Sequence, residues 1–208
     1  MNYESIIFDV DGTIWNTADV QVRAYNAQLR SEKIPLQITK EKLLPLFGSP
    51  MDRLAEGLFG EAVSAPASHA LMDRCIDRLN LLLGSCTAAD VGYPRLRDTM
   101  ERLSQKHRLF IVSNGPKGYS QQAARTLGLE DLIEGGLSFG DTGTSKGQTL
   151  LRLMREHRIE SAVYVGDTQG DLDATREAGI DFIWASYGFG TADSYVEKIY
   201  DIWQLTEL

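Results

Sequence analysis

Residues 6–13 have the sequence Ile-Ile-Phe-Asp-Val-Asp-Gly-Thr, and the rest of the chain is best interpreted from this stretch outward. The three leading apolar residues are typical of a strand buried on both faces, although periodicity alone does not distinguish them from part of a buried helix. Two carboxylates, Asp9 and Asp11, follow at once, and Gly12 permits a sharp turn after them. Unpaired carboxylates in an apolar setting are costly, so we expect a cation beside them, and ligation by oxygen alone suits Mg²⁺.

The overall composition is that of an ordinary globular protein. The 208 residues suit one domain with at most a small insertion, and 43% are hydrophobic while 24% are charged. A net charge of −8 disfavours general binding to nucleic acid or to anionic membranes. Cys75 and Cys86 form no C-x-x-C motif, no apolar run approaches the roughly 18 residues of a membrane span, and no signal peptide is recognised. We therefore expect a cytoplasmic protein with reduced thiols.

Residues 16–88 are predicted to form a helical insertion. Apolar residues recur there at helical spacing, capping residues precede the expected helices, and no strand-like run is present. The expected helices cover about residues 18–31, 40–47 and 70–83, and a further helix begins at Ser49-Pro50. The sequence thus predicts a core of residues 1–15 and 89–208 and a small α-helical domain of residues 16–88.

From residue 92 onward the pattern alternates between helix and strand. The expected strands are residues 109–112, 136–139, 162–165 and 182–185, and the last of these is the final strand expected. An amphipathic stretch around residues 195–202 is expected to cover the edge of the sheet. Alternation of this kind predicts an α/β fold, a Rossmann-like parallel sheet with right-handed crossovers and helices on both faces.

Polar residues follow three of the predicted strands, and a lysine begins the helix after a fourth. In parallel sheets the ligand site lies outside the carboxyl ends of the strands, so these residues are expected to converge. They are Asp9 and Asp11, Ser113 and Asn114, Asp167 and Asp171, and Lys146.

These stretches resemble the four motifs of the haloacid dehalogenase-like hydrolases. Residues 9–13 match the first motif, D-x-D-G-T, and Ser113-Asn114 ends an apolar strand as in the second. Lys146 opens a helix as in the third motif, and residues 166–171 match G-D-x-x-x-D, the fourth. Gly147 is a departure, because many relatives have proline after the lysine.

The resemblance implies a phosphatase with Asp9 as nucleophile and Asp11 as general acid and base. Ser113, Asn114 and Lys146 would hold the phosphoryl oxygens. Mg²⁺ is the implied cofactor, and its implied ligands are Asp9, Asp11 through its main-chain carbonyl, and Asp167. Asp171 either binds water held by the metal or orients Lys146.

The insertion resembles the helical cap of superfamily members that act on small molecules, which implies a small phosphorylated metabolite as partner. A phosphoglycolate phosphatase-like enzyme is the first expectation, with residues 47–50 facing the substrate. Arg53 either contacts a substrate anion or is an exposed surface charge.

Four alternatives remain open at this stage. A haloacid dehalogenase needs neither Asp11 nor Mg²⁺, and a phosphonate-cleaving enzyme needs a lysine in the cap, for which Lys33, Lys40 and Lys42 are available. A β-phosphoglucomutase-like phosphotransferase would share the core residues, and a non-catalytic binding protein could keep the fold.

Overall fold

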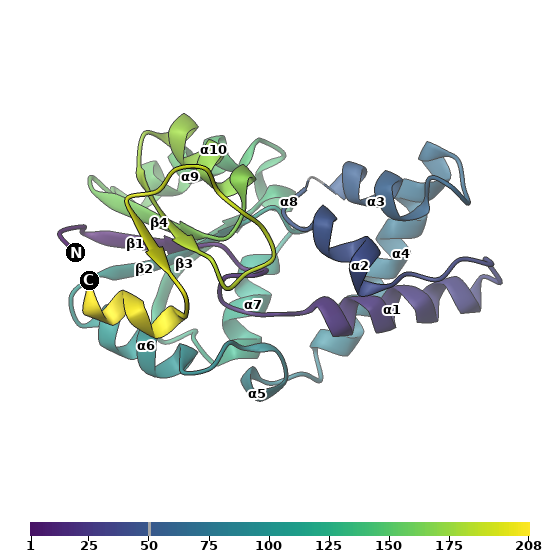
Figure 1. Ribbon diagram of the computed structural model, residues 1–208, viewed down its shortest axis with the longest axis horizontal. Coiled ribbons are helices and arrows are strands. Elements are labelled where there is room, and N and C mark those ends of the chain that lie inside the picture. Colours follow the sequence, from purple (N-terminus) through teal and green to yellow (C-terminus); the bar gives the residue numbers. More distant parts are fainter. Residues whose placement is uncertain (50) are drawn as a thin grey trace. The chain divides into compact units, whose positions relative to one another are not determined.

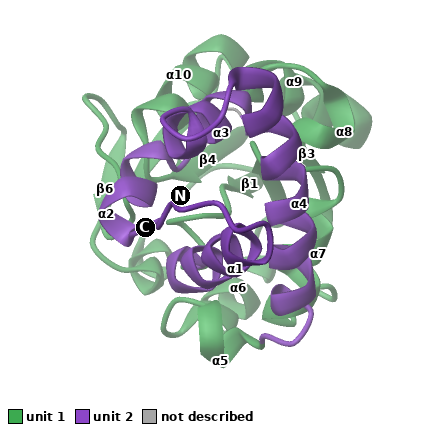
Figure 2. Cartoon of the chain, turned by 90° about the vertical axis from the view of Figure 1, so that its right-hand side faces the viewer, with its two compact units in different colours: residues 1–16, 87–208 green, residues 17–86 purple. Residues whose placement is uncertain are grey.

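A computed structural model describes residues 1–49 and 51–208 (Figure 1). Contacts within the described chain form two compact units: unit 1 is residues 1–16 with 87–208, and unit 2 is residues 17–86 (Figure 2). The borders expected from the sequence, 15/16 and 88/89, lie within two residues of the borders of these units.

Unit 1 contains a six-stranded sheet in the order β3-β2-β1-β4-β5-β6, in which every neighbouring pair is parallel. The predicted α/β class with a parallel sheet is thereby confirmed. The strands are β1 (Ser5–Phe8), β2 (Arg108–Ser113), β3 (Ile133–Ser138), β4 (Ala162–Gly166), β5 (Asp181–Ala185) and β6 (Glu197–Ile199).

Helices connect these strands and cover both faces of the sheet. In Figure 1, α9 and α10 lie on one face, and α6 and α7 lie on the other. The helices of unit 1 are α5 (Ala88–Val91), α6 (Leu96–Ser104), α7 (Tyr119–Leu127), α8 (Phe139–Thr142), α9 (Lys146–His157) and α10 (Gln169–Ala178), followed by the 3₁₀ helix η2 (Ile202–Glu207).

Strand β1 lies in the middle of the sheet, and its register determines what stands at the carboxyl edge. Phe8 is paired with Ile111 of β2 and with Val165 of β4. Strand β1 ends at this level, whereas β2 continues for two more residues to Ser113 and β4 for one more to Gly166. Asp9, Asn114 and Asp167 are the first residues after these three neighbouring strands. All four residues of β1 are buried, which explains the apolar run that marks this strand in the sequence.

The apolar core beneath α9 joins strand residues such as Phe110, Tyr164 and Phe182 to Leu150 and Leu153 of the helix. Each of these side chains is almost fully buried. Burial of a large apolar side chain stabilises the fold by about 1.5–3 kcal/mol, so this layer holds the middle of α9 against the sheet.

The end of the sheet differs from the prediction. Residues 182–185 were expected to form the last strand, but β6 follows and pairs in parallel with β5. The strand escaped prediction because it has three residues and two of them, Glu197 and Lys198, are charged. Strand β3 was expected over residues 136–139 but covers Ile133–Ser138, and Phe139 begins α8. Its early start was not predicted because Gly135 and Gly136 interrupt the apolar pattern.

Unit 2 is helical, as expected. Its elements are α1 (Ala18–Ser31), α2 (Lys40–Leu43), the 3₁₀ turn η1 (Leu44–Leu46), α3 (Met51–Phe59) and α4 (Ala65–Leu83). The single helix expected over residues 40–47 is divided at Leu43, and Pro45 lies in the 3₁₀ turn. Helix α4 begins five residues before the expected start at residue 70, with Pro66 in its first turn. The predicted helix start at Ser49-Pro50 includes Pro50, which lies outside the described residues.

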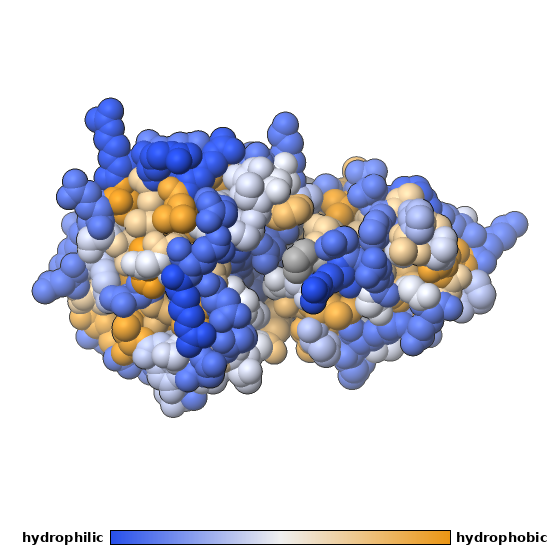
Figure 3. Space-filling model, turned by 90° about the horizontal axis from the view of Figure 1, so that it is seen from above, coloured by the Kyte–Doolittle hydropathy of each residue, from blue (hydrophilic) through white to orange (hydrophobic). Residues whose placement is uncertain are grey.

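Hydrophilic residues make up much of the face of each unit that Figure 3 presents, with hydrophobic residues dispersed among them. Among residues 1–49 and 51–208, no helix combines the length and the apolar character that a membrane crossing requires.

Candidate active site

Lys146 forms the centre of a buried polar cluster at the carboxyl edge of the sheet. Its Nζ atom lies 2.6 Å from Asp9 Oδ1 and 2.6 Å from Asp171 Oδ1, and Lys146 is only 7% exposed. Burial alone would lower the pKa of Lys146, but the two neighbouring carboxylates outweigh it and raise that pKa. The lysine is therefore a fixed positive charge held between Asp9, which follows β1, and Asp171, which lies in the first turn of α10.

Asp9 is the first residue after β1 and is 5% exposed. Burial raises its pKa from 3.8 to about 7, an effect that Lys146 opposes and Asp171 reinforces. Oδ1 takes the bond from Lys146, and the hydroxyl of Tyr164 lies 3.3 Å from the same oxygen. Because Oδ1 is engaged in this way, Oδ2 is the oxygen better placed for reaction.

Asp167 follows β4 and is completely buried. Its Oδ2 accepts a hydrogen bond of 2.7 Å from the main-chain N–H of Phe189, whereas Oδ1 has no hydrogen-bond partner among the described residues. Burial, reinforced by the charges of Asp171 and Asp9, raises the pKa of Asp167 well above its usual range. An unpartnered buried carboxylate oxygen is costly, so this position suits a ligand that the protein chain does not itself supply.

Two glycines, Gly12 and Gly188, pack against Asp167 at positions where a side chain would clash with it. Gly12 has a φ of +86°, and a Cβ atom there would lie 2.3 Å from Asp167 Oδ2. A Cβ at Gly188 would lie 2.3 Å from the Cβ of Asp167. The backbone thus approaches this carboxylate from two loops, at distances that no larger residue would permit.

Asp171 uses both of its oxygens within the protein. Oδ2 accepts hydrogen bonds from the N–H groups of Asp167 and Thr168 and from the Thr168 hydroxyl, which caps the start of α10. Oδ1 faces Lys146. Of the two roles expected for Asp171, this arrangement favours the orientation of Lys146.

The carboxylates of Asp9, Asp167 and Asp171 bring oxygen atoms within 4.8 Å of one another. Lys146 lies beside Asp9 and Asp171, and the oxygen without a hydrogen-bond partner among the described residues is Oδ1 of Asp167. A group of carboxylate oxygens with one unsatisfied, buried member fits a hard divalent cation such as Mg²⁺. Asp9 and Asp167 are the residues best suited to hold it.

Asp11 is held apart from this group of three. Its Oδ1 accepts a 3.0 Å hydrogen bond from Trp15 Nε1, and its Oδ2 accepts a 2.8 Å bond from the Tyr119 hydroxyl. Neither aromatic residue was singled out from the sequence. Trp15 follows the first motif closely, but Tyr119 is far away in the chain and no local pattern marks it.

Ser113 and Asn114 stand at the end of β2, the strand beside β1. Ser113 is buried, and its hydroxyl accepts a 3.1 Å hydrogen bond from the N–H of Gly115. The Tyr164 hydroxyl, also missed from the sequence, lies 2.9 Å from the carbonyl oxygen of Val112. It thus connects this strand end to Asp9.

Gly147 has a local explanation. A Cβ atom at this position would lie 2.3 Å from Oε2 of Glu177. The Glu177 carboxylate accepts hydrogen bonds from the Ser145 hydroxyl and from the Gln148 side chain. A negative group at the start of α9 is favourable for the helix dipole, and glycine leaves room for it.

The side chains considered for unit 2 are not buried. Lys33 and Arg53 are exposed, Lys40 forms an ion pair with Asp19, and Lys42 lies 3.5 Å from Glu61. A lysine that forms a Schiff base is usually desolvated, so the phosphonate-cleaving alternative gains no support from these three lysines.

Comparison with known proteins gives a consistent result. A family model described as haloacid dehalogenase-like hydrolase matches residues 6–185. The phosphoglycolate phosphatase of Xanthomonas campestris pv. campestris (strain 8004) is 30% identical over 195 residues, which cover 91% of this chain and 86% of that protein.

Solved structures share the fold over nearly the whole chain. A hydrolase of the haloacid dehalogenase-like family from Streptococcus pneumoniae has a TM-score of 0.84 at 18% identity, with 99% of this chain and 97% of that chain covered. A predicted phosphoglycolate phosphatase from Haemophilus somnus has a TM-score of 0.81 at 19% identity, with 100% and 98% covered.

Proposed function

This chain belongs to the haloacid dehalogenase-like hydrolases and is a phosphatase of that family, and on this basis we propose that it hydrolyses a small phosphomonoester with the help of Mg²⁺. The observation that carries the proposal is the buried pair of Lys146 and Asp9 beside Asp167, whose Oδ1 has no hydrogen-bond partner in the described part of the chain. Phosphoglycolate is the first candidate substrate, because the relative from Xanthomonas carries that activity in its name.

In the proposed first step, Oδ2 of Asp9 attacks phosphorus and the bond between phosphorus and the leaving oxygen breaks. Lys146 keeps Asp9 oriented, and together with Ser113 and the Asn114 amide it is proposed to stabilise the phosphoryl oxygens. Asp11 gives a proton to the leaving alcohol. The product of this step is an aspartyl-phosphate at Asp9.

In the second step, Asp11 accepts a proton from a water molecule whose oxygen attacks phosphorus. The bond between phosphorus and Asp9 breaks, phosphate leaves and the carboxylate is restored. Mg²⁺, held by Asp9, Asp167 and the main-chain carbonyl of Asp11, would neutralise charge on the phosphoryl group throughout.

Unit 2 is proposed to act as the cap that selects the leaving group. Its two connections to unit 1 are joined to each other, since Trp15 and Gly92 form an antiparallel bridge and the N–H of Asn16 donates a 2.7 Å hydrogen bond to Val91. The first connection begins only a few residues after Asp11. An insertion anchored so close to the acid can influence what approaches it, as closing lids do in other enzymes.

The test is a panel of phosphomonoesters that includes phosphoglycolate, sugar phosphates and nucleotides, assayed with Mg²⁺ and with a chelator. We expect phosphate release that requires Mg²⁺ and disappears in Asp9→Asn. A rapid acid quench of Asp11→Asn with an activated aryl phosphate should show a phosphate adduct by intact mass. An adduct that persists in Asp9→Asn would assign the nucleophile elsewhere, and transfer of phosphate between sugars would favour the mutase alternative.

Binding of phosphorylated ligands without turnover of any ester would favour the non-catalytic alternative.

A further inference from the structure

We propose that Trp15 and Tyr119 are positioning residues that fix the carboxylate of Asp11 for proton transfer. The inference rests on the proposed function, because it concerns the group assigned there as general acid and base. It adds two aromatic residues that do not belong to the four sequence motifs.

The geometry gives each oxygen of Asp11 its own donor. Trp15 Nε1 lies 3.0 Å from Oδ1, and the Tyr119 hydroxyl lies 2.8 Å from Oδ2. Two donors at different oxygens restrict the rotation of the carboxylate, which a single donor would not do. The two rings also contact each other in a T-shaped pair, with centroids 5.4 Å apart and planes at 74°.

Both aromatic residues are themselves held rigidly. Trp15 is completely buried, and its carbonyl oxygen accepts a 2.9 Å hydrogen bond from the N–H of Gly12. Tyr119 is the first residue of α7, and its ring lies against Gly115, where a Cβ atom would come within 2.3 Å of Tyr119 Cδ1. The turn after β2 is therefore shaped to admit this ring.

The consequence is that neighbouring carboxylates have different roles in the proposed reaction. Asp9 and Asp167 contribute to the group suited to a cation, whereas the described structure holds the Asp11 carboxylate outside that group. An acid free to rotate would spend part of its time turned away from the leaving oxygen. Catalysis by a positioned acid contributes about 10²–10⁴-fold, so loosening it removes a part of that factor.

The experiment measures how strongly the rate depends on the leaving group. Tyr119→Phe keeps the ring against Trp15 and Gly115 and removes only the hydroxyl. With Mg²⁺ present, kcat/KM is compared for phenyl phosphate, whose leaving oxygen needs a proton, and dinitrophenyl phosphate, whose leaving oxygen needs little help. We expect a loss of roughly 10-fold for phenyl phosphate and of less than about 2-fold for dinitrophenyl phosphate.

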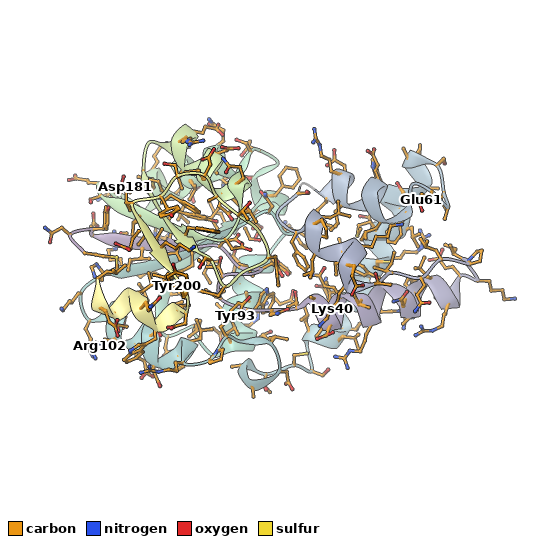
Figure 4. All side chains as sticks on the ribbon, viewed as in Figure 1. Lys40, Glu61, Tyr93, Arg102, Asp181 and Tyr200 are labelled. Carbon is orange, nitrogen blue, oxygen red and sulfur yellow. The ribbon has the colours of Figure 1, made fainter. Side chains whose placement is uncertain are left out.

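Trp15→Phe should shift the same ratio in the same direction, and it serves as a second variant. Tyr3→Phe is the matched control, because the Tyr3 hydroxyl also donates to a carboxylate oxygen, 2.7 Å away on Asp181. Asp181 begins β5 and lies toward the end of unit 1 that holds the chain termini (Figure 4). The control should leave both values of kcat/KM unchanged.

An equal loss for both esters in Tyr119→Phe, or no loss, would overturn the positioning role while leaving the proposed function intact. Wild-type protein without Mg²⁺-dependent hydrolysis, or full activity in Asp9→Asn, would instead overturn the proposed function, and this inference with it.

Discussion

Replacement of Lys146 by methionine removes the ammonium that faces both Asp9 and Asp171 and leaves a side chain of similar length. The side chains of Lys146, Asp9 and Asp171 are 5%, 7% and 1% exposed, and both Nζ–Oδ1 distances are 2.6 Å. Loss of one partner from a buried ion pair costs about 3–5 kcal/mol, because the group left behind must either stay charged without compensation or take up a proton. We expect a decrease of that size in the free energy of unfolding at pH 7.

The pH dependence sharpens this prediction. In the folded wild-type protein without metal, the pKa of Asp9 is raised to about 7, so the contribution of Asp9 to stability falls as pH rises toward 7 and is constant above it. In the variant this pKa is higher still, and folded Asp9 keeps its proton above pH 7 while the unfolded chain has lost it. The difference between the two proteins should therefore widen by up to about 1.4 kcal/mol per pH unit between pH 7 and pH 9.

Urea unfolding in the presence of a chelator measures both effects. Lys40→Met is the matched control, because Lys40 lies 2.7 Å from Asp19 in an ion pair whose side chains are 43% and 75% exposed (Figure 4). Exposed pairs contribute about 0–1 kcal/mol, so this variant should stay within 1 kcal/mol of wild type at both pH values. A loss below 1 kcal/mol for Lys146→Met, or a difference that does not widen above pH 7, would refute the compensation of Asp9 by Lys146.

Three further outcomes are expected. Gly12→Ala places a Cβ atom 2.3 Å from Asp167 Oδ2 at a φ of +86°, so it should lower the free energy of unfolding by roughly 1–3 kcal/mol and weaken Mg²⁺ binding measured by calorimetry. Gly170→Ala is the control and should do neither, because the nearest atom to its Cβ would lie 3.6 Å away. Because the pKa values of Asp9 and Asp167 are raised, protons compete with Mg²⁺ for these carboxylates. The increase in melting temperature that Mg²⁺ produces should therefore be larger at pH 8 than at pH 6, and equal increases would place the cation elsewhere. Arg53→Ala should change the ranking of substrates more than the rate with phenyl phosphate if Arg53 contacts a substrate anion, and unchanged relative rates across the panel would leave it a surface charge.

The sheet and the acidic strand ends could be predicted because their causes are local. A strand buried on both faces is an uninterrupted apolar run, and the residue after it leaves the sheet at the edge where ligands bind in such folds. Residues 6–8 and 162–165 are runs of this kind; the first leads directly into Asp9, and the second reaches Asp167 after Gly166. The family resemblance based on these motifs is confirmed by the match over residues 6–185.

The features missed from the sequence have two different causes. Strand β6 is short and polar, so it forms only because β5 offers it an edge. The bond from Tyr119 to Asp11 joins residues 108 positions apart, and no local pattern encodes it. The early start of α4 has a local cause, because Ser64 followed by a proline in the first turn is a recognised start signal, whereas the apolar spacing marks the helix only from residue 70 onward.

The antiparallel bridge between Trp15 and Gly92 has a consequence for how this protein can evolve. Because the chain leaves unit 1 and returns to it at neighbouring positions, residues 17–86 occupy the place of a simple loop. The entropic cost of closing a loop grows only with the logarithm of its length, so a longer, shorter or unrelated segment can replace this one without changing the order of the strands. Natural selection can therefore exchange the inserted segment as a module while the aspartates and Lys146 of unit 1 stay where they are.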